Sequence, residues 1–396
     1  MKSIGNYFNQ FVSRIAFRFR KETHAILRSF SLPSRGKKLL VVKLDAIGDY
    51  ILFRNALTEL KKSKRFGEHK ITLLGNSLWK ELAENLDNEV IDEFIWIDPK
   101  ILLNQSEFTS AQLKLLTKLK LRRFTVILHP VHSRMLDIDH FLSSIKAFSL
   151  IGSSGDETNY KLGEKSKGDQ LYTELIEVPD HSTFEFYRNA HFISKLTGIT
   201  PDSFRLKIDL NTTLKSNISI IISPGAGHLS RRWPIEKFVD VILQLNSAYR
   251  SAFFYICGSG ADKELGDRIL TLTMKENIQN MCGKLSLMQY ADLVNQASLV
   301  ISNESSSIHL AAALNTSAIC VSNGNMFGRF NPYPFELRNN VQTIYSSESF
   351  LDPEQFNSNV ERTRIRSTDD ISKIPAKKVI EAAITFLQQK TKSNLN

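Results

Sequence analysis

The chain has 396 residues and a mass of 45.0 kDa, a length that suits two domains of ordinary size better than one. Its 42% hydrophobic and 23% charged residues are enough to build sizeable cores, which excludes a disordered chain. Most of the net charge of +10 lies in the first 38 residues, and the nearly neutral remainder argues against a nucleic-acid groove spread over the fold.

The basic N-terminal segment, residues 1–38, contains nine Lys or Arg and one Glu, so it carries a charge of +8. Its apolar residues recur at helical spacing, at Ile4, Phe8, Phe11, Ile15 and Phe19. An aromatic stripe with basic flanks is typical of a helix that lies in a membrane interface. The segment therefore predicts contact with a membrane surface, and a helix packed on the body of the protein or on a partner is the alternative.

Three features of the sequence point to a compartment. No apolar run reaches the 18 residues of a spanning helix, and the N-terminus lacks the apolar core and cleavage site of a signal peptide. Cys257, Cys282 and Cys320 are odd in number and match no metal-site spacing, so they indicate neither a disulfide framework nor a bound metal. We expect a cytoplasmic protein, peripheral on the inner face of the cytoplasmic membrane.

Apolar runs and helical patterns alternate from residue 39 onward. We expect strands at 39–44, 71–75, 93–98, 124–130 and 149–155, and helices at 55–62, 78–86 and 108–121. Residues 156–182 show no clear pattern. Buried strands separated by helices predict a parallel sheet with helices on both faces.

A helix at 183–197 and a Pro/Asp/Asn-rich linker at 200–217 lead into a second alternating series. Its strands are expected at 218–223, 252–257, 277–283, 299–303 and 318–323, and its helices at 235–247, 261–275, 286–297 and 306–315. The fold class is therefore α/β, with two doubly wound Rossmann-like domains facing each other across a cleft. We place the domains at 39–212 and 213–350, and expect a tail, 351–396, whose helix near 370–389 packs back on the first domain.

The carboxylate of Asp49 is the first candidate for chemistry. It follows the strand that ends at Leu44 and opens the next helix together with Gly48. Ligands of doubly wound sheets bind at the carboxyl ends of the strands, so this carboxylate would project toward the ligand and could take a proton from an attacking hydroxyl. The alternative is that Asp49 only charges the start of the helix.

The turn after the strand at 218–223 is a candidate diphosphate site. The sequence reads ISIIISPGAGHLSRRWP, so Gly225 lies in a turn of small residues, and Arg231 and Arg232 follow it before a helix. Backbone N–H groups, a helix start and guanidinium groups can all face an anion. Without a divalent cation they must stabilise the charge that develops on a departing nucleotide. A solvated pair of arginines is the alternative.

The stretch CGSGADKE, 257–264, is a second turn that could contact a nucleotide. Its backbone at Gly258 could approach the ligand closely. Glu264 could bind ribose hydroxyls, or it could complement the dipole of the helix that begins here.

The stretch VISNESSSIHLAAALNT, 300–316, is a second candidate anion seat. Glu304 precedes Ser305 and Ser306, one of which is an evident N-cap for an alanine-rich helix. His309 on that helix could contact phosphate or sugar, or it could be a packed core residue.

Taken in order, these four stretches resemble glycosyltransferase family 9, the ADP-heptose:lipopolysaccharide heptosyltransferases, which have the GT-B fold. The resemblance covers roughly residues 39–335 and is strongest in PGAGHLSRRWPIEKF, YICGSGADKE and CGKLSLMQYADLVNQASLVISNESSSIHLAAAL. It implies an inverting, metal-independent transferase without a cofactor. The donor would be a nucleotide-diphosphate sugar, ADP-linked, and heptose or a related sugar would pass to a lipopolysaccharide core or another membrane glycolipid.

Carried over by position, Asp49 resembles the family's general base, and Arg231 its basic residue on the donor phosphates. The other matches lie in the nucleotide-side Gly-Lys-x-Ser-Leu turn and the Asp-Ser/Thr-Gly-x-x-His motif, at Lys284, Leu285, Ser286, Glu304, Ser305 and His309. Two positions depart from the family pattern, because Glu304 replaces an aspartate and Ser306 replaces a glycine. They motivate the alternative of a non-catalytic nucleotide-sugar or glycan-binding protein on a GT-B scaffold.

Overall fold

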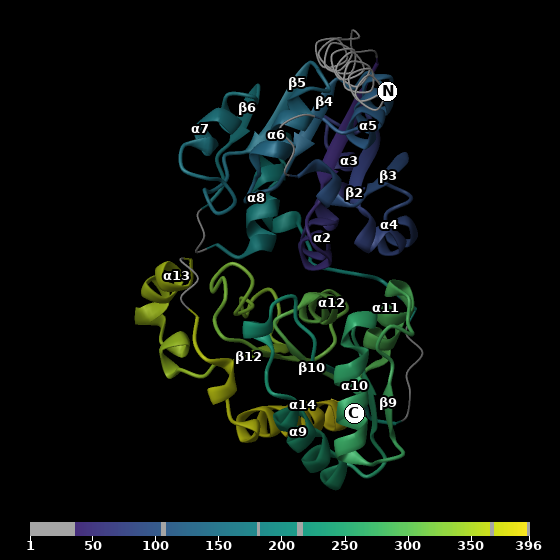
Figure 1. Cartoon of the computed structure of the whole chain (residues 1–396), viewed down its shortest axis with the longest axis vertical. Coiled ribbons are helices and arrows are strands. Elements are labelled where there is room, and N and C mark those ends of the chain that lie inside the picture. The colour runs from purple at the N-terminus through teal and green to yellow at the C-terminus, as the bar shows by residue number, and fades with distance from the viewer. Residues whose placement is uncertain (1–35, 104–107, 180–182, 212–216, 365–367, 394–396) are drawn as a thin grey trace, which may run out of the picture. The chain divides into compact units, whose positions relative to one another are not determined.

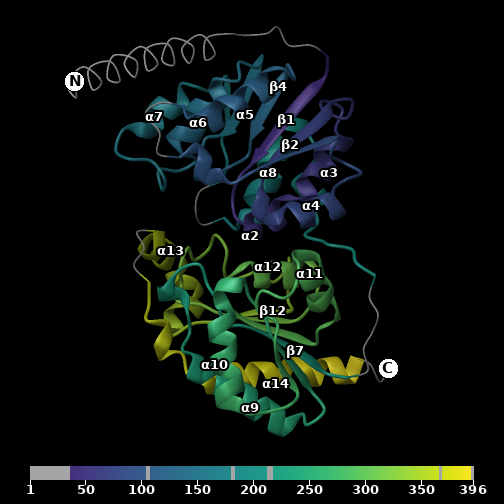
Figure 2. The same cartoon turned by 45° about the vertical axis from the view of Figure 1, so that its right-hand side comes forward.

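The structure is a computed structural model that describes residues 36–103, 108–179, 183–211, 217–364 and 368–393 (Figures 1 and 2). The interfacial helix predicted within 1–38 lies almost wholly outside these residues. None of the described helices combines the length and the apolar character needed to cross a bilayer. Contacts divide the chain into two compact units, one formed by 1–45, 61–78 and 89–178 and the other by 46–60, 79–88 and 179–396.

The first unit is built on a parallel sheet with the strand order β3-β2-β1-β4-β5-β6. Its strands are β1 (Lys38–Lys43), β2 (Lys70–Asn76), β3 (Glu93–Ile97), β4 (Val126–His129), β5 (Ser149–Ser153) and β6 (Glu174–Ile176). Its helices include α5 (Ser110–Lys120), α6 (Leu136–Ser143) and α7 (Glu164–Asp169). Strand β1 is buried along nearly its whole length, as expected of a central strand covered on both faces.

The second unit repeats this architecture with the order β12-β11-β10-β7-β8-β9, again with every pair parallel. Its strands are β7 (Ser219–Ser223), β8 (Phe253–Ile256), β9 (Ile278–Asn280), β10 (Leu299–Asn303), β11 (Ala318–Val321) and β12 (Val341–Ile344). Its helices include α8 (Glu185–Thr197), α9 (Ile235–Ala248), α10 (Lys263–Thr273), α11 (Leu287–Gln296), α12 (Ser306–Ala313) and α13 (Phe356–Arg364). In both sheets the order of the strands reverses beside the first strand in the sequence, β1 or β7. This confirms the prediction of two doubly wound domains.

The unit boundaries differ from the domains expected from the sequence. Four helices that precede the linker lie wholly or mainly in the second unit: α2 (Ile47–Phe53), α3 (Asn55–Lys62), α4 (Lys80–Leu86) and α8. Helix α2 packs on α8 and α12, and its residues from Tyr50 to Phe53 are all buried. Four consecutive buried residues point to all sides of this part of the helix, so it must be covered by neighbouring elements such as α8 and α12.

The final helix, α14 (Ala376–Ser393), was expected to pack on the first domain, and that expectation is wrong. Both views show it, in yellow, lying along α9 (Figures 1 and 2). Val379, Ala383 and Leu387 are buried in the core of the second unit. Their spacing of four residues puts them on one face, which is taken up by this core.

Candidate functional site

The turn after β7 gives two consecutive arginines different positions. Arg232 folds back on the turn, where its Nε and Nη2 donate to the carbonyl oxygen of Ala226 at 3.2 and 3.1 Å. The next residue, Trp233, is buried, and its indole N–H donates to the carbonyl oxygen of Ile374 at 3.0 Å. Arg231 is directed toward the end of β10, and 28% of its side chain is exposed. Arg232 therefore braces the turn, whereas Arg231 is directed toward the residue that follows β10.

Arg231 lies beside Glu304, the residue that follows β10. Its Nη1 is 3.9 Å from Oε1 of the Glu304 carboxyl group, which is buried. Oε2 of Glu304 accepts a hydrogen bond from the Ser322 hydroxyl at 2.7 Å, and Oε1 accepts one from Nδ2 of Asn325 at 3.4 Å. Burial raises the pKa of Glu304, against the opposing effects of the Ser322 hydrogen bond and the Arg231 charge. The predicted phosphate cation and the predicted sugar-binding carboxylate thus lie together.

Of the two serines predicted to cap α12, Ser305 is the N-cap. Its Oγ accepts from the backbone N–H of Ser307 at 3.2 Å and shares a hydrogen bond of 2.9 Å with the Ser302 hydroxyl. Ser306 is the first residue of α12. The Ser305 hydroxyl is therefore engaged in starting the helix, and an anion would meet the peptide N–H groups of the first turn instead.

His309 is buried, as are all residues of α12 from Ser307 to Ala313. Its Nδ1 is 2.6 Å from the hydroxyl oxygen of Tyr333, and its ring packs against the rings of Phe330 and Tyr333. Burial lowers the pKa of His309 to about 4, so the imidazole is neutral at pH 7. A neutral imidazole can exchange a hydrogen bond with a ligand but adds no charge to a phosphate site.

Helix α2, which carries Asp49, approaches this histidine through Gly48. A Cβ placed on Gly48 would lie 2.6 Å from Cδ2 of His309, so a side chain at position 48 would collide with the ring. Asp49 is the next residue, half-buried in the first turn of α2. The predicted base and the predicted donor-side histidine therefore lie on two helices that touch within one unit.

An ion-paired network that the sequence analysis missed holds α2 in place. Nη2 of Arg54 is 2.6 Å from Oδ1 of Asp87, and Nη1 donates to the carbonyl oxygen of Lys207 at 2.8 Å. The Tyr50 hydroxyl donates to the same Asp87 carboxylate, and its ring stacks on Trp79 with centroids 4.1 Å apart. Burial raises the pKa of Asp87 and the pKa of Tyr50. The one sequence signal was an arginine inside the apolar run ILFRNAL.

The glycines of the two predicted nucleotide turns are explained by a buried aspartate. A Cβ on Gly225 would lie 2.6 Å from Oδ1 of Asp262, and one on Gly258 would lie 2.8 Å from Cβ of Asp262. The Asp262 carboxylate accepts from the backbone N–H and hydroxyl of Ser259 at 2.9 and 2.7 Å. Both glycines thus make room for Asp262, whereas Glu264 is exposed in the first turn of α10.

The nucleotide-side turn precedes α11. Ser286 is the N-cap of this helix, with its Oγ accepting from the backbone N–H of Gln289 at 3.3 Å. Lys284 is exposed and Leu285 is half-buried. The turn therefore offers one cation and one apolar side chain to a ligand, with the serine committed to the helix.

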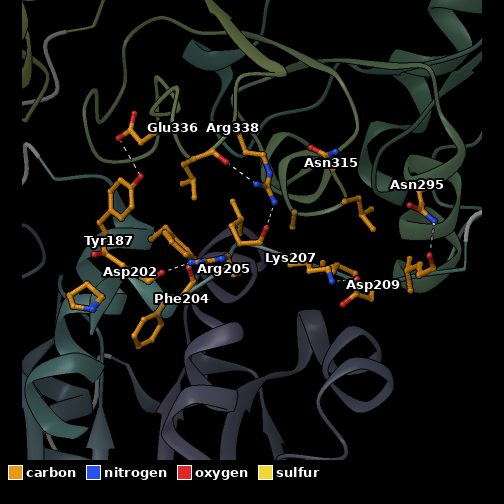
Figure 3. Close-up of a pocket in the computed structure, with 18 residues that line it drawn as sticks. Tyr187, Asp202, Phe204, Arg205, Lys207, Asp209, Asn295, Asn315, Glu336 and Arg338 are labelled. Carbon is orange, nitrogen blue, oxygen red and sulfur yellow. Dashed lines mark hydrogen bonds and ion pairs between the residues drawn. The ribbon is translucent and has the colours of Figure 1, made fainter. Parts of the chain in front are cut away.

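A separate cavity of about 720 Å³ lies near the C-terminal end of α12, and none of the predicted site residues is among the described residues that line it (Figure 3). Tyr187 donates to Glu336 at 3.3 Å, and Arg338 donates through Nε to the carbonyl oxygen of Ala312 at 2.5 Å. Lys207 pairs with Asp209 at 2.8 Å. These lining groups are therefore bound to other parts of the chain.

Part of the chain is similar to one family of known proteins. Residues 187–358 match the sequence model of glycosyltransferase family 9 (heptosyltransferase). A lipooligosaccharide heptosyltransferase 2 of Campylobacter jejuni is 26% identical over 34% of this chain and 42% of its own length, so the chain matches less than half of that relative.

Two solved structures share the fold. The E. coli ADP-heptose lipopolysaccharide heptosyltransferase II superposes with a TM-score of 0.64 at 17% identity, over 89% of this chain and 99% of that one. The E. coli heptosyltransferase WaaC with ADP-2-deoxy-2-fluoro heptose has a TM-score of 0.63 at 14% identity, over 89% and 99% of the two chains. Residues 187–358 are thus similar to glycosyltransferase family 9, and the fold of the chain is that of these two heptosyltransferase structures.

Proposed function

We propose that this protein is an inverting, metal-independent glycosyltransferase that moves heptose or a related sugar from an ADP-linked donor to a hydroxyl of a membrane glycolipid, such as a lipopolysaccharide core. The observation that carries the proposal is the clustering of residues from separate motifs. Arg231 lies beside Glu304, and α2, the helix of Asp49, packs on α12, the helix of His309. Each of these residues comes from a stretch that was singled out independently of the fold.

The proposed transfer reaction needs a group that accepts a proton and groups that stabilise the charge of the leaving diphosphate. The Asp49 carboxylate takes the proton of the acceptor hydroxyl as its oxygen bonds to the anomeric carbon of the sugar. The bond from that carbon to the phosphate oxygen breaks with its electron pair, and the nucleoside diphosphate leaves. Attack on the side opposite the leaving group inverts the anomeric centre. Arg231 and the N–H groups at the start of α12 stabilise the negative charge that develops on the diphosphate.

Donor recognition falls to the residues around β10 and α11. Glu304 is held by Ser322 and Asn325, so its carboxylate is pre-oriented for sugar hydroxyls. Neutral His309 supplies a hydrogen bond, and Lys284 and Leu285 face the nucleotide. The structural relative that holds an ADP-heptose analogue supports an ADP-linked donor. The departure from Asp at Glu304 adds one methylene in the sugar pocket, which bears on which sugar is accepted.

A panel of nucleotide sugars tests the proposal by thermal shift. A ligand that binds the native state at a concentration about 100-fold above its dissociation constant stabilises it by about 2.7 kcal/mol, and ADP-linked sugars should raise the melting temperature most. Free sugars serve as the control and should give no shift. Binding of a donor without transfer to any extracted glycolipid would instead support a nucleotide-sugar-binding protein, and no shift with any nucleotide sugar would contradict both functions.

The lipid-linked acceptor fits a membrane location. We propose that the basic segment 1–38 holds the protein peripherally on the inner face of the cytoplasmic membrane, since each Lys or Arg near an anionic surface contributes about 1 kcal/mol. Deletion of residues 1–38 should abolish co-flotation with phosphatidylglycerol vesicles and leave soluble-donor binding intact. Phosphatidylcholine vesicles are the control. If the truncated protein still floats, or binds nucleic acid with a steep salt dependence, the assignment of the charge to this segment is wrong.

A further inference from the structure

Helix α4 touches the nucleotide-side turn through one carboxylate. Oε1 of Glu81 accepts from the Ser286 hydroxyl at 2.6 Å. Oε2 accepts from the backbone N–H of Leu287 at 2.9 Å and from that of Met288 at 3.3 Å. The two oxygens of one side chain therefore bind three donors at the start of α11, where a helix favours negative charge.

The other end of α4 is bound to the C-terminal end of α2. The residue after the helix, Asp87, pairs with Arg54, and Nη2 of the same arginine donates to the carbonyl oxygen of Leu86 at 3.1 Å. One short helix thus carries a carboxylate at each end. The first lies on the turn assigned to the nucleotide, and the second lies on the helix that carries the proposed base.

We propose that Glu81 is a positioning residue for donor binding, one that fixes the turn Lys284–Ser286 in its ligand-binding conformation. This inference rests on the proposed function, because it takes that turn as the nucleotide-side contact. Ser286 and the first two N–H groups of α11 are already bound to Glu81, so the nucleotide would meet Lys284 and Leu285. Ser286 then acts through the turn and does not bind the donor itself.

The physical reason is the cost of leaving the helix start without its anion. Loss of the carboxylate charge leaves the three donors to water and lets the turn sample other conformations. Part of the free energy of donor binding is then used to order the turn. The apparent dissociation constant of the donor rises by the inverse of the fraction of time for which the turn is ordered. Because Glu81 contacts neither Asp49 nor Arg231 among the described interactions, the chemical step should be little affected.

The test compares Glu81→Gln with Glu84→Gln, which removes the same charge one turn along the same helix, where the carboxylate lies 3.9 Å from Nζ of Lys80. The probe is whichever of ADP, UDP and GDP the wild-type protein binds most tightly by calorimetry. Loss of these charge-assisted hydrogen bonds should weaken binding by about three- to tenfold for Glu81→Gln, with Glu84→Gln unchanged. In transfer assays the donor KM should rise by a similar factor while kcat stays within about twofold.

A readout without ligand separates positioning from general stability. The amides of Leu287 and Met288 should exchange hydrogen faster in Glu81→Gln than in Glu84→Gln, whereas amides in the core of the second unit should exchange at the same rate in both variants. Two results would overturn the positioning role and leave the proposed function standing. One is equal nucleotide affinity of wild type and Glu81→Gln, and the other is a fall in kcat as large as the rise in donor KM. If the wild-type protein binds none of the three nucleotides, the proposed function fails, and this inference falls with it.

Discussion

Replacement of Asp49 by Asn should lower sugar transfer by about 10²- to 10⁴-fold, the usual contribution of a general base. The amide keeps the shape of the side chain in the first turn of α2 but cannot take the proton of the acceptor hydroxyl. Donor affinity should stay within about twofold, because binding of the nucleotide does not need that proton acceptor. Single-turnover rates and calorimetric titration with the donor measure the two quantities separately.

A matched control for this variant is Asp240→Asn, which removes the same charge from the exposed side of α9. It should transfer sugar at the wild-type rate. If Asp49→Asn loses donor affinity and turnover to the same extent, Asp49 has the structural role that helix-start aspartates often have, and the base must be sought elsewhere.

The second large effect is expected at Arg231. Its replacement by Ala removes the cation beside Glu304 and should lower kcat by about 10²- to 10³-fold, since preorganised charge acts mainly on the transition state. Replacement by Lys should restore part of the rate, because it keeps the charge without the forked geometry. Steady-state kinetics of both variants, with and without a chelator, check the prediction.

The neighbouring arginine is the internal control for Arg231. Arg232→Ala removes two hydrogen bonds to the Ala226 carbonyl, so it should lower the melting temperature. The rate per folded molecule should change much less than in Arg231→Ala. The opposite outcome, with Arg232→Ala inactive at unchanged stability and Arg231→Ala active, would exchange their roles. Dependence of turnover on an added divalent metal would contradict the assignment of charge stabilisation to arginine.

The central strands of both sheets could be predicted because a strand buried on two faces is an uninterrupted apolar run. β1 and β7 show this pattern plainly, and the structure places them in the middle of their sheets. The edge strands β6 and β12 were not expected. Their sequences, ELI and VQTI, contain only two apolar residues each, too few to tell a strand from a loop. The other two edge strands, β3 and β9, lie within stretches that were expected as strands.

The residues of the candidate site could be named from motifs, but their supporting contacts could not. Nothing in the sequence pairs Arg54 with Asp87, or Glu81 with the start of α11, because each pair is brought together by tertiary folding. The same holds for Asp262, which lies between Gly225 and Gly258 although the three come from two separate turns. Sequence patterns report which side chains recur at strand ends, whereas packing decides which of them are committed to other side chains.

The interleaving of residues 46–60 and 79–88 with the second unit limits how this protein can be recombined with its relatives. A chimaera joined at the linker would bring α2 from one parent and α12 from the other. Any residue larger than glycine at position 48 would then strike the histidine ring of the partner half. Exchange of whole halves therefore requires each half to inherit the contact surface of its counterpart, whereas substitutions around β10 leave the contact between Gly48 and His309 in place.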